Sequence, residues 1–224
     1  MRKLIAAYGH TIVKGQNGWQ PSDLVQEIEP REHPDDRVVR THIHRPDLDP
    51  NSDIAYLGGG KAVVKAVHRL WLEDSTASIA FIGGIPPSMK KKFGNEIIPV
   101  SGAKIMSEAI VMCGYLSQAA DVIGKTETTE DDTRELLKLA ERHDQATVVA
   151  MAFRLPRCRL LLKDYVRRNG SDAAAIAERV SFVDAEQFLP EMFDEFVAMN
   201  QSKAYALTMA QERFGIQKLL ATNP

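Results

Sequence analysis

The sequence predicts an α/β protein in which a parallel sheet is flanked by helices. From about residue 53 onward, short apolar segments typical of strands alternate with longer segments whose apolar residues recur at helical spacing. Several strand-like segments end in glycine pairs or triplets, which are typical of strand-to-helix turns. The chain has 224 residues, 44% hydrophobic and 26% charged, so it is long and apolar enough to form one globular domain.

Before residue 53, one strand stands out at Leu4–Tyr8. Residues 15–52 are irregular in composition, with many Pro, His and Asp residues. Within them we expect a short helix at Asp23–Ile28 capped by Ser22, and a second strand at Arg37–His44. Loops of this length are often lids or binding loops, so we expect residues 15–52 to cover the glycine-rich turns that follow.

Residues 53–168 form the predicted core, and residues 184–224 form a C-terminal helical extension. In the first core helix, Val63, Val67 and Leu70 share one face. The expected strands are Ile54–Leu57, Ile79–Ile82, Val122–Ile123, Thr147–Ala152 and Ser181–Val183. The expected helices are Lys61–Glu73, Ser101–Ala119, Thr129–His143, Leu155–Arg168, Asp184–Asn200 and Lys203–Phe214, with an excursion at Lys90–Ile98.

Charge and cysteine content exclude several classes of protein. The formal net charge is -2, without the basic patch that is typical of nucleic-acid binding. No stretch reaches the ~20 apolar residues of a membrane span, and the first apolar run is too short for a signal peptide. Cys113 and Cys158 fall on apolar helix faces and form no CxxC pair, which indicates buried thiols in a reducing compartment. We therefore expect a cytoplasmic protein whose partner is a small molecule, with neither nucleic acid nor membrane.

Two glycine-rich turns mark the candidate site. Gly58-Gly59-Gly60-Lys61 joins a strand to a helix, and Gly83-Gly84 follows the next strand. In a parallel sheet such turns lie at the carboxyl edge, where open α/β sheets bind ligands. Because glycine permits close approach and a helix start offers free N–H groups, we expect an anionic ligand, the alternative being simple turns. P-loop spacing is absent, and Val63 stands where the dinucleotide fingerprint has its third glycine.

A helix beyond the second turn carries Ser107 and Glu108. Glu108 lies next to apolar positions, and as a catalytic residue it would point inward and act as a base or as an acceptor for a ribose hydroxyl, although its spacing alone favours a solvated side chain. The alternative is a solvated Glu at the margin of the apolar face.

The acidic segment Thr126–Thr133 opens the following helix. Thr128 or Thr129 as N-cap, followed by Asp131 or Asp132, resembles a capping box. Capping accounts for most of these residues, and contacts of Thr128, Thr129 and a catalytic Asp131 with a ligand or metal are the alternative.

Arg154-Leu155-Pro156-Arg157 opens another helix at the end of a strand. Proline suits the first helical turn. Arg154 and Arg157 could together clamp a phosphate or carboxylate. The alternative is a pair of surface arginines that bind nearby acids.

Taken in order, these motifs resemble the YdcF-like family, which includes the SanA and ElyC proteins. The likeness covers about residues 53–168, and its most specific parts are Ser107-Glu108-Ala109 and Phe153–Cys158. It implies a Rossmann-like fold with S-adenosylmethionine or a related nucleotide at the motif loops. The family usually has His where this chain has Arg154, and Asn where it has Asp131 or Asp132, so chemistry that depends on the His is not expected.

Three functional hypotheses follow. The first is a protein that binds a nucleotide or S-adenosylmethionine, with possible transferase or hydrolase activity. The second is a metal-dependent hydrolase, because His42 and His44 share one side of an expected strand and Asp47 and Asp49 follow closely. The third is a non-catalytic sensor or interaction protein, with a possible homodimer through the C-terminal helices. The residues leave open whether the chain is an enzyme.

Overall fold

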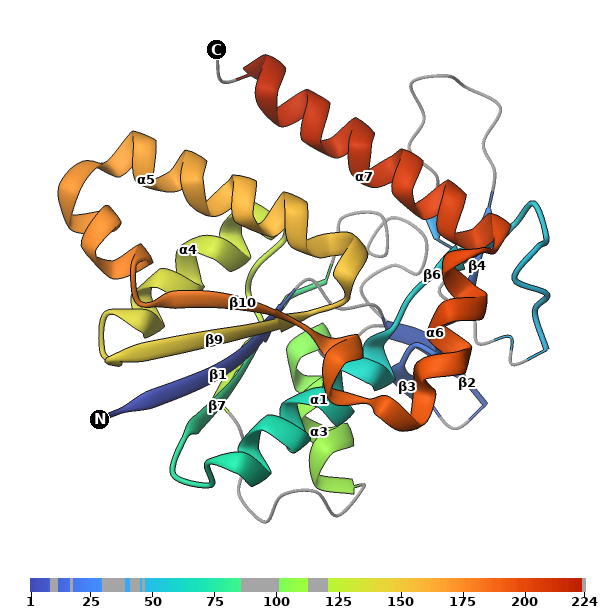
Figure 1. Ribbon diagram of the computed structural model, residues 1–224, viewed down its shortest axis with the longest axis horizontal. Helices are drawn as coiled ribbons and strands as arrows, with labels where there is room; N and C mark the ends of the chain where they lie inside the picture. Colours follow the sequence, from blue (N-terminus) through green and yellow to red (C-terminus); the bar gives the residue numbers. More distant parts are fainter. Residues whose placement is uncertain are drawn as a thin grey trace.

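A computed structural model describes residues 1–8, 12–16, 18–29, 39–40, 45, 47–85, 101–112 and 121–222. Its centre is a five-stranded sheet in the order β10-β9-β1-β7-β8, and every neighbouring pair is parallel (Figure 1). The strands are β1 (Lys3–Tyr8), β7 (Ser78–Ile82), β8 (Asp121–Ile123), β9 (Gln145–Ala150) and β10 (Val180–Asp184). The predicted α/β fold with a parallel, Rossmann-like sheet is confirmed.

The order of the strands reverses at the centre of the sheet. The chain begins in the middle with β1, adds β7 and β8 on one side, and then crosses to add β9 and β10 on the other. The connections at the carboxyl ends of β1 and β9 therefore diverge. Such a divergence is where open α/β sheets most often bind ligands.

Helices cover both faces of the sheet (Figure 1). One face packs against α1 (Gly60–Glu73) and α3 (Gly102–Met112), and the other against α4 (Thr129–Ala140) and α5 (Leu155–Ala177). The alternation along β1 shows why: Ile5 and Ala7 join the first core, whereas Leu4 and Ala6 join the second. Cys158 is buried in the second core as expected, and Cys113 lies outside the described residues.

The N-terminal segment differs from the prediction. The helix expected at Asp23–Ile28 is wrong, because Val25–Glu29 forms strand β4. β4 pairs antiparallel with β6 (Ala55–Leu57) and with β5 (Val39–Arg40), and β2 (Ile12–Gly15) and β3 (Gly18–Pro21) form a hairpin. Only β5 falls within the described part of the strand expected at Arg37–His44, and the excursion at Lys90–Ile98 lies outside the described residues.

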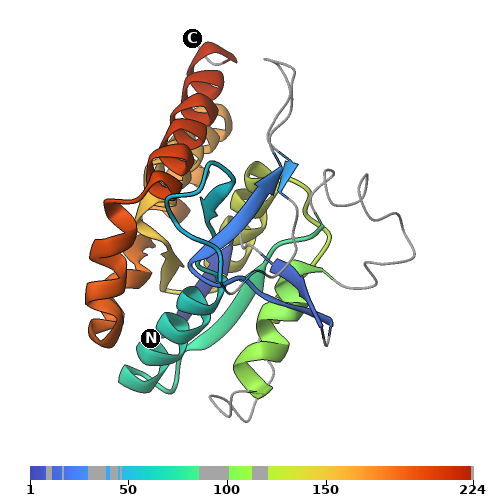
Figure 2. The same ribbon diagram turned by 90° about the vertical axis from the view of Figure 1, so that its right-hand side faces the viewer.

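β6 was expected in the parallel sheet and is instead the edge of this small three-stranded sheet, β5-β4-β6. The small sheet lies beyond the carboxyl ends of the parallel strands, on the right in Figure 1, and β4 crosses in front of those ends in Figure 2. Residues 22–24 contact the first glycine-rich turn through backbone hydrogen bonds. These three residues directly precede β4 and belong to the segment that was expected to cover the turn.

The C-terminal part also departs from the prediction. In place of one helix over Asp184–Asn200, the chain forms two short 3-10 turns, η2 (Ala185–Phe188) and η3 (Pro190–Met192), and then α6 (Phe193–Asn200). Pro190 disfavours helical geometry in the residue before it, which separates the turns. The last helix, α7, is longer than expected and spans Lys203–Thr222. Within the described residues, the helices are too short or too polar to cross a bilayer.

Candidate functional site

The Gly58–Lys61 turn begins α1 as predicted, but its N–H groups are already used. The backbone N–H groups of Gly58, Gly59 and Lys61 donate to the carbonyls of Leu24, Asp23 and Ser22 at 2.8, 2.8 and 2.9 Å. The N–H of Gly60 donates to Ser22 Oγ at 3.1 Å, so Ser22 serves the start of α1 and caps no helix of its own. Lys61 Nζ binds Asp23 at 2.6 Å. The expectation that this turn cradles an anion is therefore wrong for these four N–H groups.

The glycines of this turn allow close packing inside the protein. Gly59 has φ +81, and a Cβ atom there would lie 2.6 Å from Met151 Cγ. A Cβ atom on Gly58 would lie 2.4 Å from Ser22 Oγ. Met151 follows β9 directly, so the turn is pressed against the carboxyl end of that strand although β6 belongs to another sheet.

The second glycine turn joins the ends of β7 and β8. The N–H of Gly83 donates to the carbonyl of Ile123 at 2.9 Å, and the N–H of Gly84 donates to Thr126 Oγ1 at 2.8 Å. A Cβ atom on Gly84 would lie 1.7 Å from the carbonyl oxygen of Thr126. This glycine is thus required by the chain's own backbone, whether or not a ligand is bound.

Glu108 is exposed, as its spacing favours, and does not point inward as the predicted catalytic role requires. Its side chain is 53% exposed and lies 3.7 Å from Lys104 Nζ. The buried side of α3 carries Met106 and Ile110, and Ser107 beside them is also buried. The catalytic role predicted for Glu108 does not fit this position, because apolar residues flank this Glu in sequence while only one side of the helix meets the sheet.

Asp131 is a capping residue. Thr128 is the N-cap of α4, which Thr129 begins, and Asp131 Oδ2 accepts from the N–H of Thr128 at 3.1 Å and from its hydroxyl at 2.9 Å. Arg134 binds the other carboxylate oxygen at 2.6 Å. Burial alone would raise the pKa of Asp131, but these hydrogen bonds and the N–H of Glu127 outweigh it and lower the pKa. An acid held in this way is a poor base, so the catalytic role predicted for Asp131 is corrected to capping.

The two arginines at the start of α5 do not form the predicted clamp. Arg157 Nε lies 3.1 Å from Glu212 Oε2 on α7, and the Glu212 side chain is only 3% exposed. Arg157 therefore attaches α7 to the domain. Arg154 lies in the 3-10 turn η1 (Ala152–Arg154), is 7% exposed, and has its guanidinium carbon 5.6 Å from the ring centroid of Phe153. Of the pair, Arg154 is the cation buried at the carboxyl end of β9.

Two carboxylates that sequence reasoning missed meet near the same strand end. Asp184 is the last residue of β10, and its Oδ1 accepts from the N–H of Glu186 at 2.9 Å. Burial raises the pKa of Asp184, against backbone hydrogen bonds from Glu186 and Ala152. Burial, with the neighbouring charge of Asp184, raises the pKa of Glu186 to about 7, against a hydrogen bond from Ala152. Glu186 can therefore exchange a proton near neutral pH. Asp184 directly follows the predicted strand Ser181–Val183 and Glu186 comes two residues later, which is the signal that could have found them.

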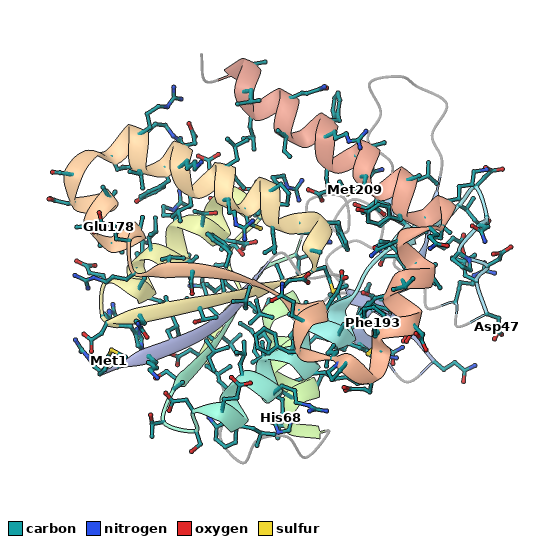
Figure 3. All side chains as sticks on the ribbon, viewed as in Figure 1. Met1, Asp47, His68, Glu178, Phe193 and Met209 are labelled. Carbon is teal, nitrogen blue, oxygen red and sulfur yellow. The ribbon has the colours of Figure 1, made fainter. Side chains whose placement is uncertain are left out.

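The metal hypothesis receives no support from the described residues. Among them, no group of three or more His, Cys, Asp or Glu side chains could hold a metal ion. His42 and His44 lie outside the described residues. Asp47 lies at the outer margin of the molecule, far from Met1 at the amino end of the sheet (Figure 3).

Neither a protein-family model nor a curated protein matches the chain. The carboxyl edge is the best-defined candidate site on structural grounds, because it brings Arg154, which follows β9, to the same edge as Asp184 and Glu186 at the end of β10.

Proposed function

We propose that this chain is a YdcF-like protein that binds a small anionic ligand, a nucleotide or S-adenosylmethionine, at the carboxyl edge of its sheet. The observation that carries the proposal is the position of Arg154. This arginine follows β9, beside the reversal of strand order, and its side chain is 7% exposed. A guanidinium with little water around it suits a phosphate or carboxylate, because its fork matches two oxygen atoms.

The proposal assigns the anionic group to Arg154 and not to the Gly58–Lys61 turn, whose N–H groups bind Ser22, Asp23 and Leu24. The small sheet β5-β4-β6 lies beyond the same edge of the parallel sheet (Figure 2).

We further propose that any reaction is a transfer or a hydrolysis with Glu186 as general acid or base. Its pKa of about 7 supports this role, because a group that titrates near the working pH both accepts and releases protons. Glu186 replaces Glu108 and Asp131, whose surroundings do not fit the role.

A thermal-shift screen of the purified chain tests the binding proposal. The panel contains S-adenosylmethionine, S-adenosylhomocysteine, common nucleotides and sugar nucleotides. A ligand at a hundred times its Kd should stabilise the fold by about 2.7 kcal/mol, which raises Tm by several degrees. We expect Arg154→Met to abolish the shift, and Arg159→Met, an exposed position on the same helix, to leave it unchanged. A panel without a single shift, or equal shifts in both variants, would contradict the proposal.

A non-catalytic interaction protein is the second candidate. On α7, Phe214 and Leu220 are 63% and 55% exposed, which supports a homodimer through this helix. Sedimentation equilibrium at micromolar concentration distinguishes a dimer from a monomer, and a monomer would remove this candidate. We also propose a cytoplasmic location, which the burial of the Cys158 side chain within the second core supports.

A further inference from the structure

The long helix α5 is interrupted at Gly170. This residue has φ 77 and ψ -157, so the helical segment that begins at Leu155 ends there, and a second segment continues to Ala177. Figure 1 shows the chain turning at this end of α5 toward β10. Glycine is the usual residue where a helix ends in a left-handed conformation, because without a Cβ atom it adopts that conformation without strain.

The residue before this glycine is Asn169, and the surrounding chain lies at the surface. All residues from 167 to 172 are exposed. A Cβ atom added to Gly170 would meet nothing within 4 Å, so the backbone here borders open space. Asn169 Nδ2 donates to the carbonyl of Tyr165 at 2.8 Å, a hydrogen bond within the last turn before the interruption. Exposed terminal turns of this kind open readily, because few buried contacts hold them.

An asparagine followed by glycine is chemically labile. When the last turn opens, the backbone nitrogen of Gly170 can reach the side-chain carbonyl carbon Cγ of Asn169 and close a ring with it. Glycine favours this attack because it places no Cβ atom beside the nitrogen and has the least restricted backbone. Asparagine is accordingly among the thermolabile residues of proteins. The sequence has one other such pair, Asn17-Gly18, whose Asn lies outside the described residues.

We propose that Asn169 is a site of spontaneous deamidation, a modification that the chain undergoes without an enzyme. The Gly170 nitrogen forms a bond to Asn169 Cγ, the bond from Cγ to Nδ2 breaks, and Nδ2 leaves as ammonia with the proton that the Gly170 nitrogen loses. Water then opens the resulting succinimide at either of its carbonyls. One opening gives aspartate, and the other gives isoaspartate, in which the chain continues through the side-chain carbon. Asparagine and water thus become an acid and ammonia, and no oxidant or cofactor takes part.

Either product changes the turn between the two helical segments of α5. The amide that donates to Tyr165 is lost, and a carboxylate has no proton to donate to a carbonyl. The new negative charge lies at the carboxyl end of a helical segment, where the helix dipole disfavours it. Isoaspartate also lengthens the backbone by a carbon atom. We therefore expect the turn to be less ordered in modified chains.

A peptide map of the folded, full-length chain after incubation in mildly alkaline buffer tests the proposal. Alkaline buffer accelerates the reaction, because the Gly170 nitrogen must lose its proton. We expect the peptide with Asn169 to gain about one dalton and to separate into two chromatographic peaks, aspartate and isoaspartate. Asn51 and Asn200 are controls within the same chain, because both are exposed and each precedes a residue whose side chain hinders the attack. We expect modification at Asn169 to be several-fold faster than at either control.

Variants distinguish this reaction from other causes of the same gain in mass. Asn169→Gln keeps an amide but requires a larger ring, so this position should show no gain over the same time. Asn51→Gln is the matched control and should leave the modification of Asn169 unchanged. If Asn169 stays unmodified in the folded chain while the urea-unfolded chain is modified there, the helix protects this residue and the proposal is overturned. Aspartate without isoaspartate, or equal rates at Asn51 and Asn200, would also overturn it.

Discussion

Replacing Glu186 with glutamine is expected to stabilise the protein above neutral pH. In the folded chain the pKa of Glu186 is raised from 4.5 to about 7, by burial and by the charge of Asp184. The neutral form is therefore favoured on folding. The contribution of neutral Glu186 to the free energy of unfolding is fully present below the unfolded pKa of 4.5 and is lost as the pH rises through about 7.

The size of the effect follows from the same pKa values. A rise from 4.5 to about 7 corresponds to at most about 3.4 kcal/mol at ~1.36 kcal/mol per pKa unit. Glu186 is only partly buried, so screening by water reduces this to about 1–2 kcal/mol, or a Tm shift of about 3–6 °C for a domain of this size. Glutamine does not ionise, so Glu186→Gln should match the parent chain at pH 4 and exceed its stability by this amount at pH 8.

Urea unfolding at several pH values measures this difference. Glu191→Gln is the matched control, because Glu191 is exposed and lies 3.4 Å from the exposed Arg69, a contact expected to contribute less than about 1 kcal/mol. If Glu186→Gln and Glu191→Gln give the same dependence of unfolding free energy on pH, the environment assigned to Glu186 is wrong.

Two further substitutions probe the packing around the site. Arg157 Nε lies 3.1 Å from Glu212 Oε2, and the Glu212 side chain is only 3% exposed, so Arg157→Met leaves a buried carboxylate without its cation. We expect this variant to lower the free energy of unfolding, measured by chemical denaturation, by about 3–5 kcal/mol. A loss below about 1 kcal/mol would show that α7 is not attached in this way. Gly84→Ala brings a Cβ atom to 1.7 Å from the carbonyl oxygen of Thr126 and should lower stability by about 1–3 kcal/mol. An unchanged melting temperature in that variant would contradict the close approach of the β7 and β8 ends.

The parallel sheet was predictable because its strands are short apolar runs separated by clear helical periods. β4 was not. Val25–Glu29 is five residues long and has apolar residues only at its first and fourth positions, a spacing that fits a helix turn as well as a strand in so short a segment. Its pairing with Ala55–Leu57, some thirty residues later in the chain, decides for the strand. The same pairing places β6 in the small sheet and not in the parallel sheet. The three residues of β6 alone do not indicate which sheet they join.

Several residues predicted to form a site at the carboxyl edge of the sheet have other contacts in the structure. The Gly58–Lys61 turn does begin a helix, but the segment that occupies its N–H groups, Ser22–Leu24, lies far away in sequence. Likewise, nothing local to Arg157 shows that Glu212 is its partner. Arg154 and the capping role of Thr128 were visible locally, because strand ends and helix starts have short sequence signals.

Binding of a ligand at the carboxyl edge is tested most directly by hydrogen–deuterium exchange with the ligand that gives the largest thermal shift. We predict slower backbone exchange at residues 151–154, which follow β9, and at residues 22–26, which lead into β4, with no change along α7 or at the exposed end of α5. Unchanged exchange at both strand-end segments, or slower exchange confined to α7, would contradict a ligand site between the parallel sheet and β4.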